Sequence, residues 1–458
     1  MAQIITKSRA NLNDNEFMVS PITEKVLHKE YREASAFGGM SKTVKERVIK
    51  NASGDTTIDV ATSAAVWHKS IDSGDEARFA LTRNIDGVPT YGDAPIKTGE
   101  RLSIMNASVF LNRIDTPAIP IMADMQTHRI KDIFSDIIQK GEVREQVKMF
   151  FAEEDTLEGY RGFLRGASQN LLASSDIGGA NLDLGRGAGK QVSPEHVIMA
   201  GVGSLPSVKS YSATALDNHE ANILNLIKNA DADIIANGGG TTASREAYAF
   251  TNYGITRDWI QDFREYISSI LKIAPTMEGG KPKWYVLCDP DIFRYLTRQD
   301  SDLWKLWEST GPRGLQNPVF AGYETIELDG IVFIRDAWLR KFRPDASGSE
   351  EVVWGTNSQV SIRSFFPTKT WGCMCVLGNR AMLSATSGSV AFTEKVGDHG
   401  KGWEVAANTK MGYQRLRWQS KDGKTDVLQQ NSCLVLAYAG ASTFQKKTGI
   451  TIPSASVS

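Results

Sequence analysis

One polar segment restricts the fold more than any other part of this 458-residue chain. Residues Pro89–Arg101 contain two Pro, two Gly and charges of both signs, so they can bury little apolar surface. Apolar triplets lie on both sides of this segment, at Phe79–Leu81 and Val109–Leu111. We expect the triplets to lie in two strands of a long hairpin that holds the polar segment out from its domain. A mobile surface loop is the alternative interpretation.

The overall composition is that of a soluble globular protein, with 41% apolar and 23% charged residues. The 52 basic and 53 acidic residues give a net charge of -1. Such a chain has no general attraction to nucleic acid or anionic membranes, and little self-repulsion opposes the close packing of many copies. No apolar run approaches the roughly 18 residues of a membrane span, and the N-terminus lacks the apolar core of a signal peptide. We therefore expect a cytoplasmic protein with no membrane partner.

The four cysteines do not form the pattern of a disulfide framework or of a metal site. Cys373 and Cys375 are close together, whereas Cys288 and Cys433 stand alone. Structural zinc usually takes four ligands, and no second Cys or His pair is present to complete such a set. The sequence therefore predicts four buried free thiols and no bound metal.

Glycine-rich motifs give only weak support for an enzyme. Residues 185–190 resemble a phosphate-binding loop, but Leu184 and Gln191 occupy the positions that need Gly and Ser or Thr. Residues 238–240 precede a helical pattern and could present backbone N–H groups to an anion. A cytosolic α/β enzyme that binds an anionic substrate through the Gly-rich region 173–245 therefore remains as an alternative.

The strongest helical pattern runs from Glu142 to about Arg165. Its apolar residues recur at steps of three and four, which predicts an amphipathic helix. Three consecutive carboxylates, Glu153, Glu154 and Asp155, lie on the opposite face. Like charges this close destabilise a helix by a few tenths of a kcal/mol per pair unless cations compensate them.

The remaining pattern alternates between helices and strands, which indicates a mixed α+β and α/β fold. The expected helices are Ser41–Lys50, Ile130–Ile138, Asn218–Ala230, Ala243–Ala249, Arg257–Ile273 and Asp291–Arg298. The expected strands are Trp284–Cys288, Thr325–Leu328, Ile331–Arg335, Val352–Trp354, Trp371–Val376, Ser389–Phe392 and Cys433–Tyr438.

Several segments, taken in order, resemble the tailed-phage major capsid proteins of the lytic podovirus N-four type, which have the Hong Kong 97-type fold. The segments that carry the resemblance are Gly92–Glu100, Gln126–Leu172, Lys283–Pro290, Asn317–Gly322, Leu328–Val332, Lys410–Tyr413 and Thr425–Val427. None of these segments is a catalytic signature, and their order carries more weight than any one of them.

The resemblance implies a division of the chain into an arm, an extended loop, two domains and a tail. The long helix would be the spine helix of the peripheral domain. The implied parts are an N-terminal arm at 1–60, an extended-loop region at 61–115, a discontinuous peripheral domain at 116–215 and 365–440, an axial domain at 216–364 and a C-terminal tail at 441–458.

The resemblance also implies the function of a structural protein without catalytic residues or cofactors. Its copies would form hexamers and pentamers of an icosahedral shell in the virion, assembled in the host cytoplasm. The shell would enclose double-stranded DNA without sequence-specific binding. Only about 60 residues precede the first strands, which implies a separate scaffolding protein. A portal, with or without a decoration protein, would complete the set of partners.

The extended loop would contact a neighbouring copy, with Lys97, Glu100 and Arg101 as its contact residues. We expect Lys97 or Arg101 to compensate the carboxylates Glu153, Glu154 and Asp155 of that neighbour. A solvated acidic face is the alternative, because an exposed ion pair contributes only about 0–1 kcal/mol.

Overall fold

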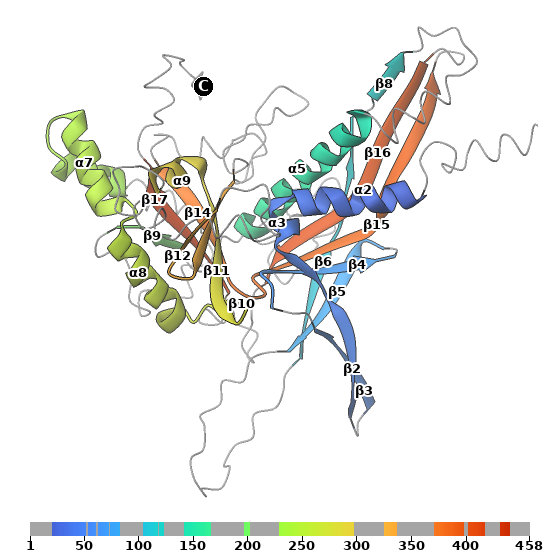
Figure 1. Ribbon diagram of the computed structural model, residues 1–458, viewed down its shortest axis with the longest axis horizontal. Helices are drawn as coiled ribbons and strands as arrows, with labels where there is room; N and C mark the ends of the chain where they lie inside the picture. Colours follow the sequence, from blue (N-terminus) through green and yellow to red (C-terminus); the bar gives the residue numbers. More distant parts are fainter. Residues whose placement is uncertain are drawn as a thin grey trace, which may run out of the picture.

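The computed structural model describes residues 21–51, 54–60, 63–72, 74–82, 104–117, 119–122, 142–165, 197–201, 229–296, 325–336, 371–397, 402–416 and 431–439. They form two mixed sheets, two further hairpins, and helices packed against the sheets (Figure 1). The expected mixed α/β fold class is confirmed.

The first sheet has the strand order β1-β4-β15-β16-β7, and β8 also pairs with β16. Its longest strands, β15 and β16, form an antiparallel hairpin, which shifts register between Ser387 and Ala391. The neighbouring β4 runs parallel to β15. The strands are β1 (Ser41–Thr43), β4 (Val66–Ile71), β7 (Asn112–Asp115), β8 (Ile119–Met122), β15 (Met382–Gly397) and β16 (Gly402–Arg415).

The second sheet has the order β12-β13-β11-β14-β17-β9, and β10 pairs with β11. Every residue of β14 and β17 is buried. Strands covered on both faces appear in a sequence as continuous apolar runs, which is why these two were predictable. The strands are β9 (Val197–Met199), β10 (Thr276–Glu278), β11 (Lys281–Cys288), β12 (Thr325–Leu328), β13 (Ile331–Arg335), β14 (Trp371–Leu377) and β17 (Ser432–Tyr438).

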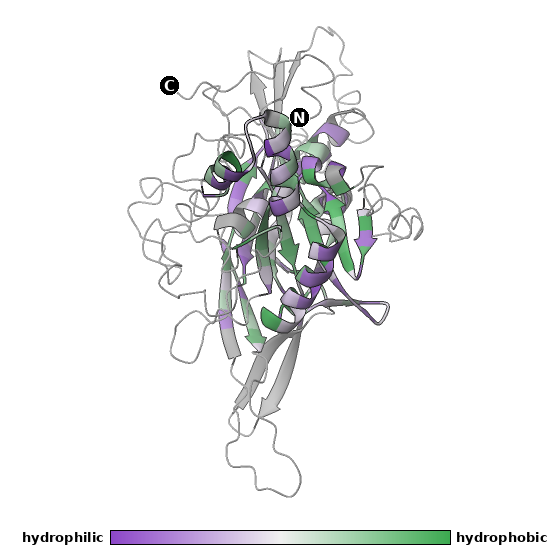
Figure 2. Cartoon of the chain, turned by 90° about the vertical axis from the view of Figure 1, so that its left-hand side faces the viewer, coloured by the Kyte–Doolittle hydropathy of each residue, from purple (hydrophilic) through white to green (hydrophobic). Residues whose placement is uncertain are grey.

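The helices form two groups, one beside each sheet (Figure 1). Beside the first sheet lie α2 (Pro21–Ala34), α3 (Ala36–Gly39) and α5 (Glu142–Arg165). Beside the second lie α7 (Thr242–Tyr253), α8 (Arg257–Glu265), the π-helix η5 (Tyr266–Ile270), α9 (Pro290–Leu296) and the helical residues 229–237. Figure 2 shows hydrophobic residues concentrated on the central strands and hydrophilic ones along the outer helices.

The hairpin expected around the polar segment 89–101 is confirmed. Strands β5 (Glu76–Thr82) and β6 (Ile104–Phe110) are antiparallel, with Phe79 opposite Ala107 and Leu81 opposite Met105. The segment between them lies outside the described residues.

The short helix expected at Ser41–Lys50 is wrong. Those residues form β1 and most of β2 (Lys45–Asn51), which pairs with β3 (Gly54–Val60). The helices of this region, α2 and α3, come earlier in the chain. Strand formation here depends on partners elsewhere in the sequence: β1 pairs with β4, which begins at Val66. A local pattern cannot supply that information.

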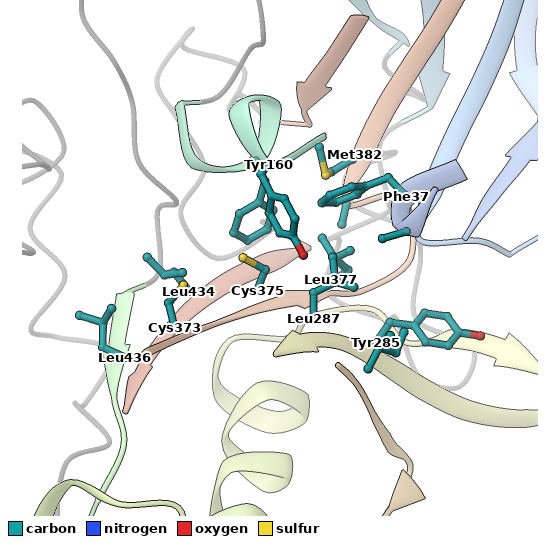
Figure 3. Packing of buried hydrophobic residues seen from close by; sticks show 14 of the residues in the cluster. Phe37, Tyr160, Tyr285, Leu287, Cys373, Cys375, Leu377, Met382, Leu434 and Leu436 are labelled. Atoms are coloured by element: carbon teal, nitrogen blue, oxygen red, sulfur yellow. The ribbon is translucent and has the colours of Figure 1, made fainter. Parts of the chain in front are cut away.

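The two sheets share one hydrophobic core (Figure 3). Tyr160 of α5 and Phe37 of α3 contribute to the same buried cluster as Leu287, Cys375 and Leu436 of the second sheet. The Tyr160 hydroxyl also donates a hydrogen bond to Asp336 Oδ2 at 2.5 Å, at the end of β13. Helix α5 therefore joins the first sheet to the second.

The strand pairing distributes the segments of the expected peripheral domain over both sheets. We expected residues 116–215 and 365–440 to lie together, which would place β9, β14 and β17 with the long helix. These three strands instead pair in the second sheet, next to β11. The chain returns to the first sheet after β14, where the backbone N–H groups of Arg380 and Ala381 donate to the carbonyls of Ala64 and Ala65.

Candidate functional site around the long helix

The three carboxylates predicted on the long helix have different surroundings. Glu153 is half-buried, whereas Glu154 is 5% exposed and Asp155 is fully buried. The expectation of an acidic face open to a neighbouring copy is therefore wrong for Glu154 and Asp155. The other predicted contact residues, Lys97, Glu100 and Arg101, lie outside the described residues.

Helix α5 is enclosed on all sides between Glu154 and Tyr160, where every residue is buried. Two glycines allow this close packing. A Cβ atom at Gly159 would lie 2.1 Å from Cδ2 of Phe37 in α3, and one at Gly162 would lie 2.7 Å from Cβ of Tyr413 in β16. Helix α3 and strand β16 therefore enclose α5 from two directions, and its acidic residues lie inside the subunit.

Asp155 belongs to a polar cluster, which we define as His28, Arg32, Ser35, His68 and Asp155; His28 is half-buried and the other four are buried. Ser35, the N-cap of α3, donates a hydrogen bond from its hydroxyl to Asp155 Oδ2. Burial raises the pKa of Asp155, while the Arg32 charge and the hydrogen bond from Ser35 act in the opposite direction. The carboxylate is thus held by its own chain.

The centre of the polar cluster is the contact between Arg32 of α2 and His68 of β4. Arg32 Nη1 lies 2.6 Å and 2.9 Å from the two ring nitrogens of His68, so it donates to whichever nitrogen of the neutral ring carries no proton. Arg32 Nη2 donates to Ser41 Oγ at 3.0 Å. Within the described residues, these hydrogen bonds satisfy a buried guanidinium without an ion pair.

Both histidines of the polar cluster are held neutral near pH 7. Burial and the neighbouring Arg32 charge lower the pKa of His68 well below its usual range, and they lower the pKa of His28 to about 4. The Ser384 hydroxyl lies 3.1 Å from His68 Nδ1, and the Tyr31 hydroxyl lies 3.1 Å from His28 Nδ1. The arrangement positions side chains and contains no activated nucleophile.

Sequence reasoning missed this cluster. Leu27 and Tyr31 are four residues apart and both buried, which is a signal for α2. No local signal indicates that Arg32 would meet His68, because the two are 36 residues apart.

The expected burial of the four cysteines is confirmed. All four are free and buried. Burial raises the pKa of the Cys288, Cys375 and Cys433 thiols, which makes them poor nucleophiles. Among the residues that the structure describes, no group of His, Cys, Asp and Glu is arranged to hold a metal ion.

The start of α7, which belongs to the Gly-rich region, is capped by its own chain. Thr241 and Ser244 form a capping box, in which Thr241 Oγ1 accepts from the Ser244 N–H at 3.2 Å. That donor is therefore not available to an anionic substrate. No helix within the described ranges is long and apolar enough to cross a membrane.

Comparison with known proteins identifies the family. A sequence model described as phage capsid protein matches residues 33–439. None of the curated proteins matches the chain in sequence.

Similar solved structures include three phage capsids. The capsid of Ralstonia phage GP4 has 15% identity and a TM-score of 0.44, covering 83% of this chain and 89% of that one. The Cyanophage Pam1 capsid has 13% identity and a TM-score of 0.44, covering 82% and 89%. The acidic stable capsid of Helicobacter pylori bacteriophage KHP30 has 13% identity and a TM-score of 0.43, covering 88% and 91%.

The assignment rests on the family match, because likeness at these TM-scores is weak. That match begins in α2, ends just after β17, and includes both sheets and α5. The chain therefore belongs to the phage capsid protein family and is a structural protein of the phage capsid.

Proposed function

We propose that this capsid protein has the Hong Kong 97-type arrangement and assembles as hexamers and pentamers of an icosahedral shell. The first sheet with α2, α3 and α5 would form the peripheral domain, and the second sheet would form the axial domain. Head-to-tail contacts between identical copies close into rings of this kind. The nearly neutral net charge of the chain favours the close packing of many copies.

The observation that carries the proposal is the way the β5–β6 hairpin holds the polar segment 89–101. Ala77, Phe79 and Leu81 of β5 and Val109 of β6 are fully buried. They pack in one cluster with Trp67 and with Leu383 of the first sheet. The base of the hairpin is therefore built into its own subunit, whereas the residues that join its strands contain little that a core could bury.

We assign the inter-subunit contacts of this segment to Lys97, Glu100 and Arg101. Glu153 is the carboxylate in α5 that we retain as their counterpart on a neighbouring copy, because it is only half-buried. Glu154 and Asp155 are withdrawn, since both are buried inside the subunit. Each such pair contributes only about 0–1 kcal/mol, but a shell repeats the contact in every subunit.

The proposal extends to partners that the family match leaves open. We propose that the shell assembles in the host cytoplasm together with a separate scaffolding protein and a portal, with or without a decoration protein. The shell would enclose double-stranded DNA without reading its sequence. We propose no catalytic residue and no cofactor. The enzyme alternative has no support from the described part of region 173–245.

Deleting Pro89–Arg101 is expected to leave a folded subunit that no longer assembles. The deletion retains about eight residues between β5 and β6, enough to close an antiparallel hairpin. Contacts that together contribute about 1.4 kcal/mol change the association constant between two subunits about tenfold, and the deletion removes all contacts of the segment at once. Sedimentation velocity measures the assembly, and circular dichroism with thermal unfolding measures the fold.

A matched control replaces the same residues by a Gly- and Ser-rich segment of equal length. This variant keeps the length of the connection and loses its side chains, so it is also expected to fail in assembly. Stable shells formed by the deletion variant would contradict the assigned role. Assembly of the Gly/Ser variant alone would show that the backbone, and not Lys97, Glu100 or Arg101, makes the contact.

A further inference from the structure

The arm, which we define as α2 and α3, is attached to the rest of the subunit through an unusual mixture of contacts. Leu27, Tyr31 and Phe37 provide its large buried apolar side chains. Between them lie polar groups that are also buried: Arg32 at 7% exposure and Ser35 at 0%. A buried polar group stabilises an interface only while its partners stay in the correct protonation state.

Two elements supply the groups that face His68 directly. Helix α2 contributes the Arg32 cation and the neutral ring of His28. Strand β15 contributes the neutral hydroxyls of Ser384 and Thr386. On the other side of the polar cluster, α5 contributes Asp155, which Ser35 binds, and Glu158, whose charge acts on Asp155.

We propose that His68, together with His28, is a proton-operated latch that holds the arm on α5 and β15. When His68 takes up a proton, a second buried cation stands within hydrogen-bond distance of Arg32, and the ring nitrogen that accepted from Arg32 becomes a donor. Both changes oppose the docked arm. The arm is then released, while the second sheet, whose strands contain none of the groups of the polar cluster, stays folded.

The direction of the pH dependence follows from the histidines. Their pKa values are lower in the docked arm than the usual value of about 6.5, so the docked state is favoured above that pH. Its stability falls as the pH decreases toward about 4, the pKa of docked His28. Each histidine that takes up a proton on release increases the release equilibrium constant about tenfold per pH unit.

Asp155 acts in the opposite direction. Burial raises the pKa of Asp155, so its carboxyl binds a proton at a higher pH in the docked state than in the released state. This proton offsets the one that a histidine takes up on release. Two histidines against one carboxylate leave a net uptake of about one proton on release. The release equilibrium constant should therefore increase about tenfold, and by no less than about threefold, per pH unit between pH 6 and 5.

Hydrogen exchange on free full-length subunits tests the latch. Between pH 7 and 4.5, protection at the amides of residues 27–39, corrected for intrinsic rates, should fall about tenfold, and by no less than about threefold, per pH unit below pH 6. Protection in β11 and β14 should stay constant. In His68→Gln, whose side chain cannot take up the proton, the fall in protection per pH unit should be about tenfold smaller. Arg32→Met, which removes the first cation, should also reduce the slope.

Two outcomes would overturn the latch. One is an unchanged slope in His68→Gln; the other is loss of protection in the arm and in β14 at the same pH, which is global unfolding. If neither variant folds at pH 7, as judged by circular dichroism, the wild-type profile decides. A slope below about threefold per pH unit between pH 6 and 5 would then contradict the net uptake of one proton.

Discussion

Replacing Phe37 by alanine is expected to lower the free energy of unfolding of the subunit by about 3–5 kcal/mol. The Phe37 ring is fully buried and contacts two aromatic rings, Tyr160 of α5 at 5.0 Å and Tyr413 of β16 at 5.8 Å between centroids. Gly159 lies against its face. Truncation would leave a cavity where the arm, the long helix and the first sheet meet, and tightly packed backbone limits its collapse.

Urea unfolding of the free subunit measures this loss. Met149→Ala in α5 is the matched control: its side chain is 62% exposed, so the change should stay within about 0.5 kcal/mol. A loss below about 1 kcal/mol for Phe37→Ala would contradict the central position of this ring.

Replacing Gly412 by alanine should destabilise the subunit by about 3 kcal/mol, at the upper end of the usual range for overpacking. Gly412 lies within β16, and the connection from β6 to β7, at Phe110 and Leu111, passes closely over this glycine. A Cβ atom there would lie 2.0 Å from the carbonyl oxygen of Phe110. The clash is with backbone, so no rotamer change relieves it, and it outweighs the gain of about 0.4–1 kcal/mol that alanine brings by restricting the unfolded chain.

Gly240→Ala is the control for that substitution. Its Cβ would meet no atom within 4 Å, so the variant should be neutral or slightly more stable than wild type. Thermal unfolding of both variants gives the comparison. Equal stability of the two would show that β6 and β7 do not cross β16 as closely as described.

Elements with a strong local pattern were predictable from the sequence. The long helix was expected from Glu142 to about Arg165, and α5 has those bounds. The runs Thr325–Leu328 and Ile331–Arg335 are β12 and β13 as expected. Their apolar residues are buried by a sheet of continuous apolar strands, so the local pattern and the final environment agree.

Features that depend on distant segments were not predictable. The expected strand Ser389–Phe392 is the middle of β15, which runs from Met382 to Gly397, because pairing with β16 and β4 extends it through residues of low strand propensity. The helix expected at Arg257–Ile273 ends as α8 at Glu265 and continues as the π-helix Tyr266–Ile270. Neither change has a signature in the local sequence.

The candidate site shows the same limit. The acidic run Glu153–Asp155 has the appearance of an exposed face in the sequence, yet Asp155 is fully buried by Ser35 and its neighbours. Ser35 and Asp155 are 120 residues apart. Only the tertiary structure shows that the arm covers this side of the helix.

Electron microscopy of the purified full-length protein tests the central claim, that this chain builds a shell from its own copies. We expect closed particles, or rings of five and six subunits that associate into larger particles as the protein concentration rises. A uniform population of small closed oligomers, unchanged over a wide range of concentration, would contradict the claim.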